Sequence, residues 1–307
     1  MPTTINVNDL DIIYLSYDEP NCEENWRDLQ LHFPNAQRVH GVKGSDAAHK
    51  ACADVARTDR FITVDGDNRI KEPFMTYSYT FDDSWDITDS VLSLPALNRT
   101  NGLQYGNGGI KMWPKHVVKN MRTHEAARDA HSKSGVDFCW ALDYILMPGV
   151  WSDVWINKTP AQAWRAGFRE GVKLSLIDGV KFDGSAAVWK SKIARSNFDR
   201  LCMWLQAGAD VENGIYAVLG ARMGLYKTML TNWDSTQVQD FDNLDHIFHT
   251  EVENNTNIQL TIQELGTELI NQLRMPIDAT PFNVLQSQWI KSVFANPTRT
   301  EPKRLRG

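Results

Sequence analysis

The stretch Phe61–Arg69, FITVDGDNR, carries two carboxylates to the end of an apolar run. Its first residues suit a buried strand, and Asp65 and Asp67 follow with only Gly66 between them. Carboxylates that share one site repel each other unless a cation lies between them. A hard divalent ion accepts one or two protein carboxylates and completes its shell with phosphate oxygens and water. Because glycine also lets the backbone approach a ligand closely, the stretch indicates a metal–diphosphate site.

A tight turn and a calcium-binding loop are the alternatives to a metal–diphosphate site at this motif. The string DGDN is a good turn, and as a bare motif the turn accounts for it equally well. A calcium-binding loop does not fit, because its glycine position holds Ile70 and its twelfth position holds Thr76 instead of glutamate. The choice between turn and metal site therefore depends on the elements that precede the motif.

Strand-like and helix-like segments alternate before the motif. The expected strands are residues 11–17, 36–42 and 60–67, and the expected helices are residues 22–33 and 44–57. This alternation predicts an α/β fold with a parallel, doubly wound sheet, which binds ligands at the carboxyl ends of its strands. Asp18, Glu19, Asp65 and Asp67 all follow such ends, which favours the metal site.

The pattern changes after residue 74. Strand-like segments occur at residues 75–81 and 137–147, and from residue 159 onward the pattern is mostly helical. We expect a mostly parallel sheet with a mainly helical C-terminal extension. The expected division is a catalytic domain over residues 1–200, a helical region packed on it over residues 201–295, and a polar tail over residues 296–307.

Composition predicts a soluble globular protein, with 42% hydrophobic and 23% charged residues among 307. Its four cysteines are far apart and form no C-x-x-C pair, so neither a zinc site nor a disulfide framework is indicated. A reducing cytoplasm is the expected location. The N-terminus lacks the pattern of a signal peptide, and no apolar run is long enough to span a membrane.

Charge is unevenly distributed along the chain, whose net charge is −6. Residues 99–200 hold 16 lysines and arginines against 9 acids, a net charge of +7, and the remainder carries −13. A basic middle segment is compatible with a phosphate-bearing partner. Scattered, solvated charge accounts for the composition equally well.

Several strings resemble a known family. SYDEPN (16–21), GVKGSDAAHKACADVA (41–56) and FITVDGDN (61–68) resemble GT-A-fold glycosyltransferases. The D-x-D motif of that family binds Mn²⁺ or Mg²⁺ with a nucleotide-sugar diphosphate, and a UDP-sugar is the favoured donor. SYDEPNCEENW, RVHGVKG and TPAQAWRAGFREGVKLSL are similar to a group of bacteriophage-encoded glycosyltransferases. The general resemblance covers about residues 10–150.

This resemblance implies roles for individual residues. Asp67 would bind the metal, and Asp65 would contact the ribose or a metal-bound water. Lys50 would lie near the nucleotide phosphates, although many family members carry Arg or Asn where this chain has His49 and Lys50. A solvated helix cation and a satisfied, partly buried histidine account for these two residues equally well. The residues implied to line the nucleotide pocket are Ser16, Tyr17, Asp18 and Glu19.

A helix predicted to begin at Thr159 carries a stripe of cations. Thr159 is a good N-cap, and Gln162 completes a capping box. Arg165, Arg169 and Lys173 follow at a spacing of four residues and share one face. A solvated face is the default interpretation. The alternative is an anion, either the donor diphosphate or the phosphate backbone of an acceptor.

Inverting members of the family need a carboxylate that deprotonates the acceptor hydroxyl. Asp143, at the end of an apolar segment, is the first candidate, and Asp153 is the second. Retaining members lack this base and often supply a late histidine as an additional metal ligand. His246 and His249 share a helix face and are the candidates for that role. The sequence leaves both stereochemical outcomes open.

The sequence thus predicts metal-dependent transfer of a sugar from a nucleotide diphosphate to a hydroxyl group. The phage-like strings, the basic middle and eleven tryptophans suggest 5-hydroxymethylcytosine in DNA as the acceptor, modified in the host cytoplasm. Alternatives are transfer to a surface polysaccharide or a small molecule. A nucleotidyltransferase is disfavoured, because the first strand lacks a Gly-rich basic signature. A non-catalytic carbohydrate- or DNA-binding protein on the same fold is the remaining alternative.

Overall fold

The computed structural model describes residues 2–122, 143–297 and 299–305. The strands are β1 (Thr3–Asn6), β2 (Asp11–Ser16), β3 (Gln37–His40), β4 (Arg60–Asp65), β5 (Asn68–Ile70), β6 (Ser78–Phe81), β7 (Val91–Asn98), β8 (Gln104–Pro114), β9 (Tyr144–Leu146), β10 (Ser152–Val154) and β11 (Lys303–Leu305). The helices are α1 (Cys22–His32), α2 (Ser45–Val55), α3 (Lys115–Asn120), α4 (Pro160–Ser175), α5 (Ala186–Lys192), α6 (Arg195–Trp204), α7 (Gly214–Leu230), α8 (Phe241–Glu251), α9 (Ile258–Leu273) and α10 (Val284–Val293). Short 3₁₀ turns lie at Val7–Asp9, Glu72–Thr76 and Ser235–Gln239.

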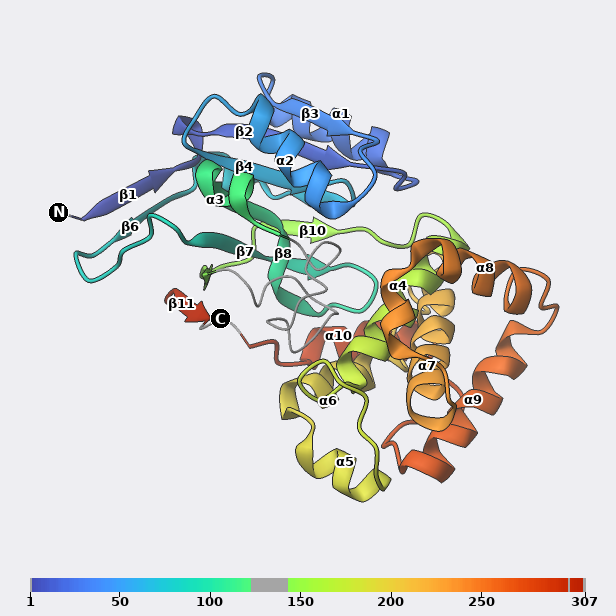
Figure 1. Ribbon diagram of the computed structural model, residues 1–307. Helices are drawn as coiled ribbons and strands as arrows, with labels where there is room; N and C mark the ends of the chain where they lie inside the picture. Colours follow the sequence, from blue (N-terminus) through green and yellow to red (C-terminus); the bar gives the residue numbers. More distant parts are fainter. Residues whose placement is uncertain (1, 123–142, 298, 306–307) are drawn as a thin grey trace.

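The fold is α/β, with a large sheet ordered β11-β9-β7-β8-β4-β2-β3. The helices from α4 onward gather beyond one end of this sheet (Figure 1). The strands β2, β3 and β4 pair in parallel, as the alternating pattern predicts. However, β8 runs antiparallel to both β4 and β7, and β11 is antiparallel to β9. The sheet is therefore mixed, since β7 pairs in parallel with β9 and β10 whereas β8 is antiparallel to both of its neighbours. The expectation of a mostly parallel sheet holds only in part.

The two faces of the sheet are covered by different helices. Ile62 of β4 belongs to the same core cluster as Leu29 of α1. The neighbouring Phe61 belongs to the cluster of Cys52 in α2. Since successive strand residues point to opposite faces, α1 and α2 cover opposite faces, which is the doubly wound arrangement expected for this half.

The early elements match the predicted ones within a few residues, and the later strands differ. Only residues 78–81 of the expected strand 75–81 are extended, and they form β6, which pairs with β1 outside the main sheet. The expected strand 137–147 is represented by β9 at residues 144–146. The part of that prediction before residue 143 lies outside the described residues.

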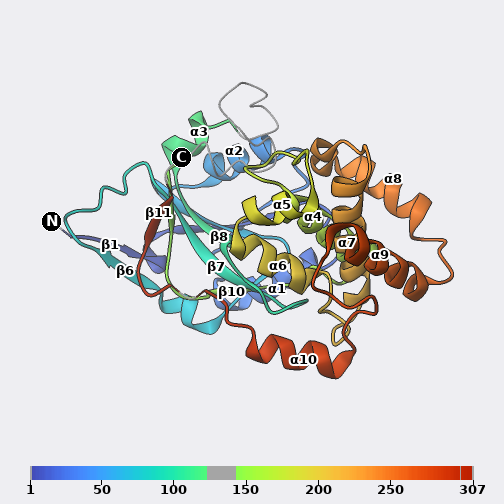
Figure 2. The ribbon, with the colours of Figure 1, turned by 90° about the horizontal axis from the view of Figure 1, so that it is seen from below.

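Two long helices, α4 and α7, form the centre of the helical part. They lie to the right of the sheet in Figure 2. Their contact is lined by Gly167 and Gly171 of α4 and Gly220 and Gly224 of α7. A Cβ atom added at Gly167 would lie 1.9 Å from the Ala217 carbonyl oxygen. The absence of side chains at these positions is what allows the two backbones to touch.

The helical core begins before residue 201. Trp164 and Phe168 of α4 share one core cluster with Leu219 of α7 and Phe248 of α8. A second core cluster contains residues of α4, α5, α6, α7 and α9. The helical part is therefore built from α4 onward, because the apolar stripe of α4 packs on α7.

Part of the C-terminal segment, which was expected to be a polar tail, forms a strand. Residues Lys303–Leu305 form β11, which pairs antiparallel with β9 at the edge of the sheet. Arg304 reaches Asp143, with 2.7 Å between Nη1 and Oδ2. Backbone pairing and this ion pair explain why a segment of polar composition is held.

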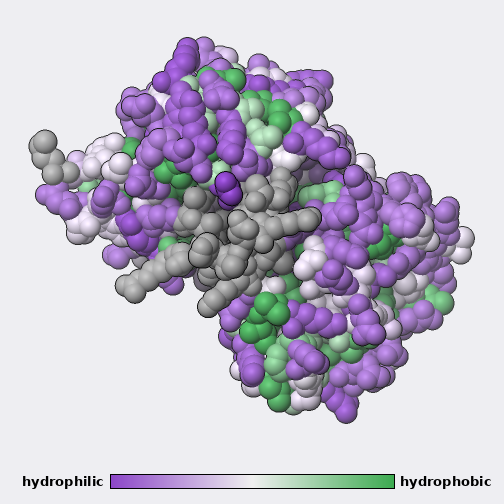
Figure 3. Space-filling model, in the orientation of Figure 1, coloured by the Kyte–Doolittle hydropathy of each residue, from purple (hydrophilic) through white to green (hydrophobic). Residues whose placement is uncertain are grey.

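The surface facing the viewer in Figure 3 is mostly hydrophilic, with small and separate apolar patches. The exposed apolar side chains include Val180 and Val188 near α5. No helix in the described ranges is long and apolar enough to cross a membrane.

Candidate functional site

The D-x-D loop, Asp65-Gly66-Asp67, leaves the carboxyl end of β4 in the middle of the sheet. The Gly66 carbonyl oxygen accepts hydrogen bonds from the Tyr14 hydroxyl at 2.7 Å and from Asn25 Nδ2 at 2.9 Å. The Asp67 carbonyl oxygen accepts one from the Trp155 backbone N–H at 2.8 Å. Elements from distant parts of the chain thus fix the backbone on which both carboxylates stand.

Close approach is the reason for glycine at the centre of this loop. A Cβ atom at Gly66 would lie 2.5 Å from Glu19 Oε2 and 3.0 Å from Ser16 Cβ. Glycine therefore lets the loop pack against the residues that follow β2. The sequence predicted that the carboxyl ends of β2 and β4 meet, and the structure brings Ser16 and Glu19 to the D-x-D loop.

Burial and neighbouring charges at the loop disfavour the ionised forms of Asp67 and Glu19. Burial raises the pKa of Asp67 to about 7, and the nearby charges of Asp65 and Glu19 add to the rise. The pKa of Glu19 is also raised, first by its burial and then by the charges of Asp65 and Asp18. A divalent cation would relieve this repulsion, and carboxylate oxygens are the donors that Mg²⁺ and similar hard ions prefer.

The loop offers two carboxylates, and a metal ion held by them would need further ligands. Among the described residues, no group of three or more His, Cys, Asp or Glu side chains could hold a metal ion by itself. A metal ion at these two carboxylates would have to take its remaining ligands from a diphosphate and water. Asp65 and Asp67 therefore fit Mn²⁺ or Mg²⁺ only together with such a ligand.

Metal affinity should depend on pH because the ion competes with a proton on Asp67. Below the raised pKa of about 7 this carboxyl holds a proton, which must leave before metal binds. We expect the Mn²⁺ affinity, measured by calorimetry with a nucleoside diphosphate present, to fall up to about tenfold per pH unit below pH 7. An affinity that is constant between pH 5.5 and 8 would contradict a metal-binding role for Asp67.

Lys111 is the residue at this site that sequence reasoning missed. It lies on β8 opposite Thr63 and is buried, with Nζ 2.9 Å from the Gly108 carbonyl oxygen. Nζ also lies 3.8 Å from Asp65 Oδ2. A lone lysine within the apolar run GGIKMW was the signal that could have found it, because a buried cation needs an anionic partner. It places a positive charge beside Asp65.

The residues implied to line the nucleotide pocket lie beside the loop. Ser16 Oγ lies 3.0 Å from His40 Nδ1 and accepts a hydrogen bond from Arg38 Nε at 3.1 Å. Glu19 Oε2 accepts one from the Tyr17 backbone N–H at 2.8 Å. The Tyr17 ring is exposed and available to a ligand. Asp18 contributes to the charge around Glu19.

The pair His49 and Lys50, in the middle of α2, has contacts within the protein. Lys50 Nζ forms an ion pair with Asp46 Oδ2 at 2.6 Å, one helical turn earlier. His49 is buried, and its Nδ1 donates to the Ser45 carbonyl oxygen at 2.8 Å. Burial lowers the pKa of His49. Its ring packs edge-on against Trp113 with 5.0 Å between ring centroids, so His49 is a core residue.

The structure does not bring Asp143 to the D-x-D loop. The strand register aligns Ile145 with Ile62, so Asp143 is level with Arg60 at the start of β4. Asp65 is five residues further along β4, which corresponds to about 16 Å at the usual rise of a strand. Asp143 is bound there by Ser90 Oγ and Arg304. The expectation that Asp143 is the catalytic base is corrected, because Asp143 lies level with the start of β4 whereas Asp65 lies at its carboxyl end.

Asp153 lies nearer to the site, paired with Arg69 of β5, but is directed elsewhere. It lies on β10, where the preceding Ser152 donates to Asn68 Oδ1 at 2.7 Å. Alternate strand residues point to opposite faces, so Asp153 points away from Asn68. Its Oδ1 lies 3.4 Å from Lys71 Nζ, which makes it an ion-pair partner. The structure therefore does not support Asp153 as the base.

His246 and His249 also lie apart from the two carboxylates. Both are exposed on α8, and His249 Nδ1 lies 2.7 Å from Glu253 Oε2. Neither joins Asp65 and Asp67 in a metal-binding group of the described residues. Helical spacing placed the two histidines on one face but could not place that face in the molecule.

The cationic stripe of α4 is largely paired within the protein. The helix begins as predicted, with Thr159 Oγ1 accepting from the Gln162 N–H at 3.1 Å. Arg165 Nη1 lies 3.3 Å from Asp245 Oδ1, and Lys173 pairs with Glu170. The guanidinium groups of Arg165 and Arg169 lie 5.0 and 4.8 Å from the centre of the Phe241 ring. The stripe therefore joins α4 to α8 in addition to any role with an anion.

Comparison with known proteins adds no family assignment. The chain matches no protein-family model, and no curated protein is significantly similar to it in sequence.

Proposed function

We propose that the protein is a metal-dependent glycosyltransferase that moves a sugar from a nucleotide diphosphate donor to a hydroxyl acceptor. The observation that carries the proposal is the pair Asp65 and Asp67, placed at the carboxyl end of the central strand β4. Parallel strands β2 and β3 lie beside it, where α/β sheets bind nucleotides. The proposal includes a GT-A fold for this half of the chain.

The residues around the loop suit the parts of a nucleotide-sugar. Asp65 and Asp67 would hold Mn²⁺ or Mg²⁺, which stabilises the charge that develops on the departing diphosphate. Lys111 would supply a second positive charge at the same place. Ser16 and the exposed ring of Tyr17, at the end of β2, would contact the nucleoside. A UDP-sugar is the first donor to test.

A 5-hydroxymethylated cytosine in phage DNA, reached in the host cytoplasm, is the acceptor that we propose on the basis of the sequence. Its hydroxymethyl group supplies a hydroxyl nucleophile that unmodified cytosine lacks, and it projects into the major groove. The basic segment gives this acceptor little further support. Its described cations spread from β8 to α6, and several pair with acids outside the segment, including Asp54, Glu24 and Asp245.

The test of function has two stages. In the first, a panel of nucleotide sugars is screened for Mn²⁺-dependent thermal stabilisation and for release of nucleoside diphosphate. We expect one donor to stabilise the protein with Mn²⁺ and to lose this effect in EDTA. No metal-dependent stabilisation or turnover with any donor would refute the glycosyltransferase and leave a non-catalytic binding protein.

The second stage identifies the acceptor with the active donor. DNA with and without 5-hydroxymethylcytosine is incubated with enzyme and Mn²⁺, digested, and analysed by mass spectrometry. We expect added hexose or pentose only on the modified base. Donor turnover without any labelled base would reject the DNA acceptor and direct the search to polysaccharide and small-molecule acceptors.

A further inference from the structure

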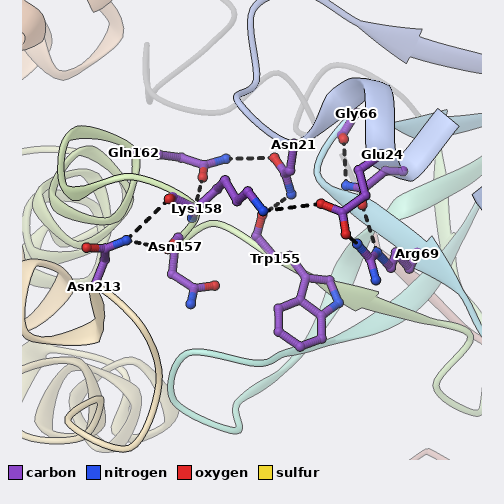
Figure 4. A network of polar contacts seen from close by, with 10 residues as sticks. Asn21, Glu24, Gly66, Arg69, Trp155, Asn157, Lys158, Gln162 and Asn213 are labelled. Atoms are coloured by element: carbon purple, nitrogen blue, oxygen red, sulfur yellow. Dashed lines mark hydrogen bonds and ion pairs between the residues drawn. The ribbon is translucent and has the colours of Figure 1, made fainter. Parts of the chain in front are cut away.

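A pocket of about 380 Å³ lies where the sheet meets the helical part. Its walls come from α1, β5, the segment between β10 and α4, and the segment between α6 and α7. Pockets of this size are within the range that hold small ligands. Figure 4 shows that Trp155 and Asn157 project to the same side, below Lys158 and Glu24.

This pocket is separate from the face that carries Asp65. Asp65 shares its sheet face with Thr63 and Lys111, on the side of α2. The pocket instead takes Glu24 from α1, which covers the other face, and Asn21, which caps that helix. A ligand in the pocket would therefore lie behind the D-x-D loop and away from Lys111.

A chain of polar contacts connects the pocket to the loop. Arg69 Nε donates to Asn25 Oδ1 at 2.8 Å, and Asn25 Nδ2 donates to the Gly66 carbonyl oxygen at 2.9 Å. Trp155 lines the pocket, and its backbone N–H holds the Asp67 carbonyl oxygen. The pocket walls and the backbone of the D-x-D loop are therefore parts of one network.

The same wall is tied to the helical part. Asn21 Nδ2 donates to the Trp155 carbonyl oxygen at 2.8 Å. Asn21 Oδ1 accepts from Gln162 Nε2 of α4 at 3.1 Å. These bonds hold α1 and α4 together at the pocket (Figure 4), so its shape is set before any ligand binds.

The charges in the pocket are balanced. Glu24 forms ion pairs with Arg69 at 2.6 Å and with Lys158 at 3.3 Å, and Glu212 contributes a second carboxylate to the lining. An isolated phosphate would be repelled by both carboxylates. A free base would need an open ring face for stacking. However, the guanidinium groups of Arg69 and Arg99 lie 5.7 and 5.5 Å from the centre of the Trp155 ring.

A neutral polyhydroxyl ligand matches this lining. Each hydroxyl can donate to a carboxylate such as Glu24 and accept from a cation such as Lys158 or Arg69. The buried amide of Asn157 adds further polar capacity, and the indole edge of Trp155 offers apolar surface. We propose that this pocket is a second ligand site, which binds a neutral saccharide behind the D-x-D loop.

The inference goes beyond the proposed function, and its test uses neither metal nor nucleotide sugar. The full chain is mixed with the methyl glycosides of glucose, galactose, mannose and N-acetylglucosamine, and binding is followed by saturation-transfer NMR and titration. We expect at least one glycoside to bind the wild-type protein. Inorganic phosphate and a thymidine oligonucleotide are run in parallel and should not compete with it.

Variants on one helix then locate the binding. Glu24→Gln keeps the shape of the pocket wall but removes the charge that accepts from a sugar hydroxyl, and should weaken binding about tenfold. Glu23→Gln is the matched control, because Glu23 is the adjacent residue of α1 and also pairs with an arginine, Arg38, at 2.6 Å. It should leave glycoside binding unchanged. Glu212→Gln provides a second test if Glu24→Gln does not fold.

Three results would overturn the proposal. They are the absence of binding by all four glycosides, equal affinity in Glu24→Gln, Glu212→Gln and the Glu23→Gln control, and displacement of the glycoside by phosphate or the oligonucleotide. The donor screen is measured separately. A failed donor screen with intact glycoside binding would remove the glycosyltransferase and leave the saccharide site in place.

Discussion

Asp67→Asn is expected to abolish sugar transfer and, without metal, to make the protein more stable at pH 8. Asparagine cannot supply the anionic oxygen that the metal needs, so turnover should fall by at least about a hundredfold. The stability effect comes from the pKa of Asp67, which is raised to about 7 in the folded protein. The folded state binds this proton more tightly than the unfolded state, so stability falls as pH rises from about 4 towards 7.

Asp67→Asn has no carboxyl to deprotonate and so avoids this loss of stability, which in the wild type is complete above pH 7. Asp67→Asn should therefore melt at a higher temperature than the wild type at pH 8 and at a similar temperature at pH 4. A difference of about 1 kcal/mol in the free energy of unfolding corresponds to roughly 2–4 °C in the melting temperature of domains of 150–250 residues. Differential scanning calorimetry in EDTA measures the difference. Addition of Mn²⁺ with the nucleotide sugar should stabilise only the wild type.

Asp143→Asn is the control for this experiment. Asp143 is the first candidate base from the sequence, but it lies level with the start of β4, in an ion pair with Arg304. Its variant should retain turnover close to that of the wild type. Full activity in Asp67→Asn, or loss of activity only in Asp143→Asn, would show that the site lies elsewhere.

Gly220→Ala is expected to be among the most destabilising single methyl additions in the helical part. The new Cβ would lie 2.1 Å from the Trp164 carbonyl oxygen, and at Gly167 it would lie 1.9 Å from that of Ala217. A backbone oxygen within a helix cannot rotate away as a side chain can. Either variant must therefore push α4 and α7 apart, at a cost of about 1–3 kcal/mol or more.

Urea and thermal denaturation would measure this cost. Gln263→Ala on α9 is the control, because Gln263 is exposed and alanine has a high helix propensity. Its melting temperature should remain near that of the wild type. Melting of Gly220→Ala and Gly167→Ala at the wild-type temperature would mean that α4 and α7 do not pack through these glycines.

Local sequence patterns predicted the first half of the fold well. The elements β2, α1, β3, α2 and β4 follow from short-range periodicity, because parallel strands joined by helices bury continuous apolar runs. The same patterns put Asp65 and Asp67 beside the residues that follow β2. The N-cap at Thr159 was also predictable, since capping depends on residues only three positions apart.

Tertiary structure decided everything that depends on register and on which distant segments meet. Asp143 looked like a residue at the end of an apolar segment, but the pairing of β9 with β7 and β11 places it level with the start of β4, far from Asp65. Lys111 looked like an isolated cation until the pairing of β8 with β4 set it beside Asp65. Neither result follows from local sequence, because strand order is set by the burial of whole faces and not by neighbouring residues.

Residue types and spacing by themselves determined that this chain carries two carboxylates at a strand end of an α/β sheet. The pKa of Asp67 is raised only by the fold, because packing buries its carboxyl and brings Asp65 and Glu19 near it from the ends of β4 and β2. The pocket behind the loop likewise exists only because α1, β5 and the segment before α4 meet there. Sequence determines which groups can ionise, whereas desolvation and proximity depend on packing in three dimensions.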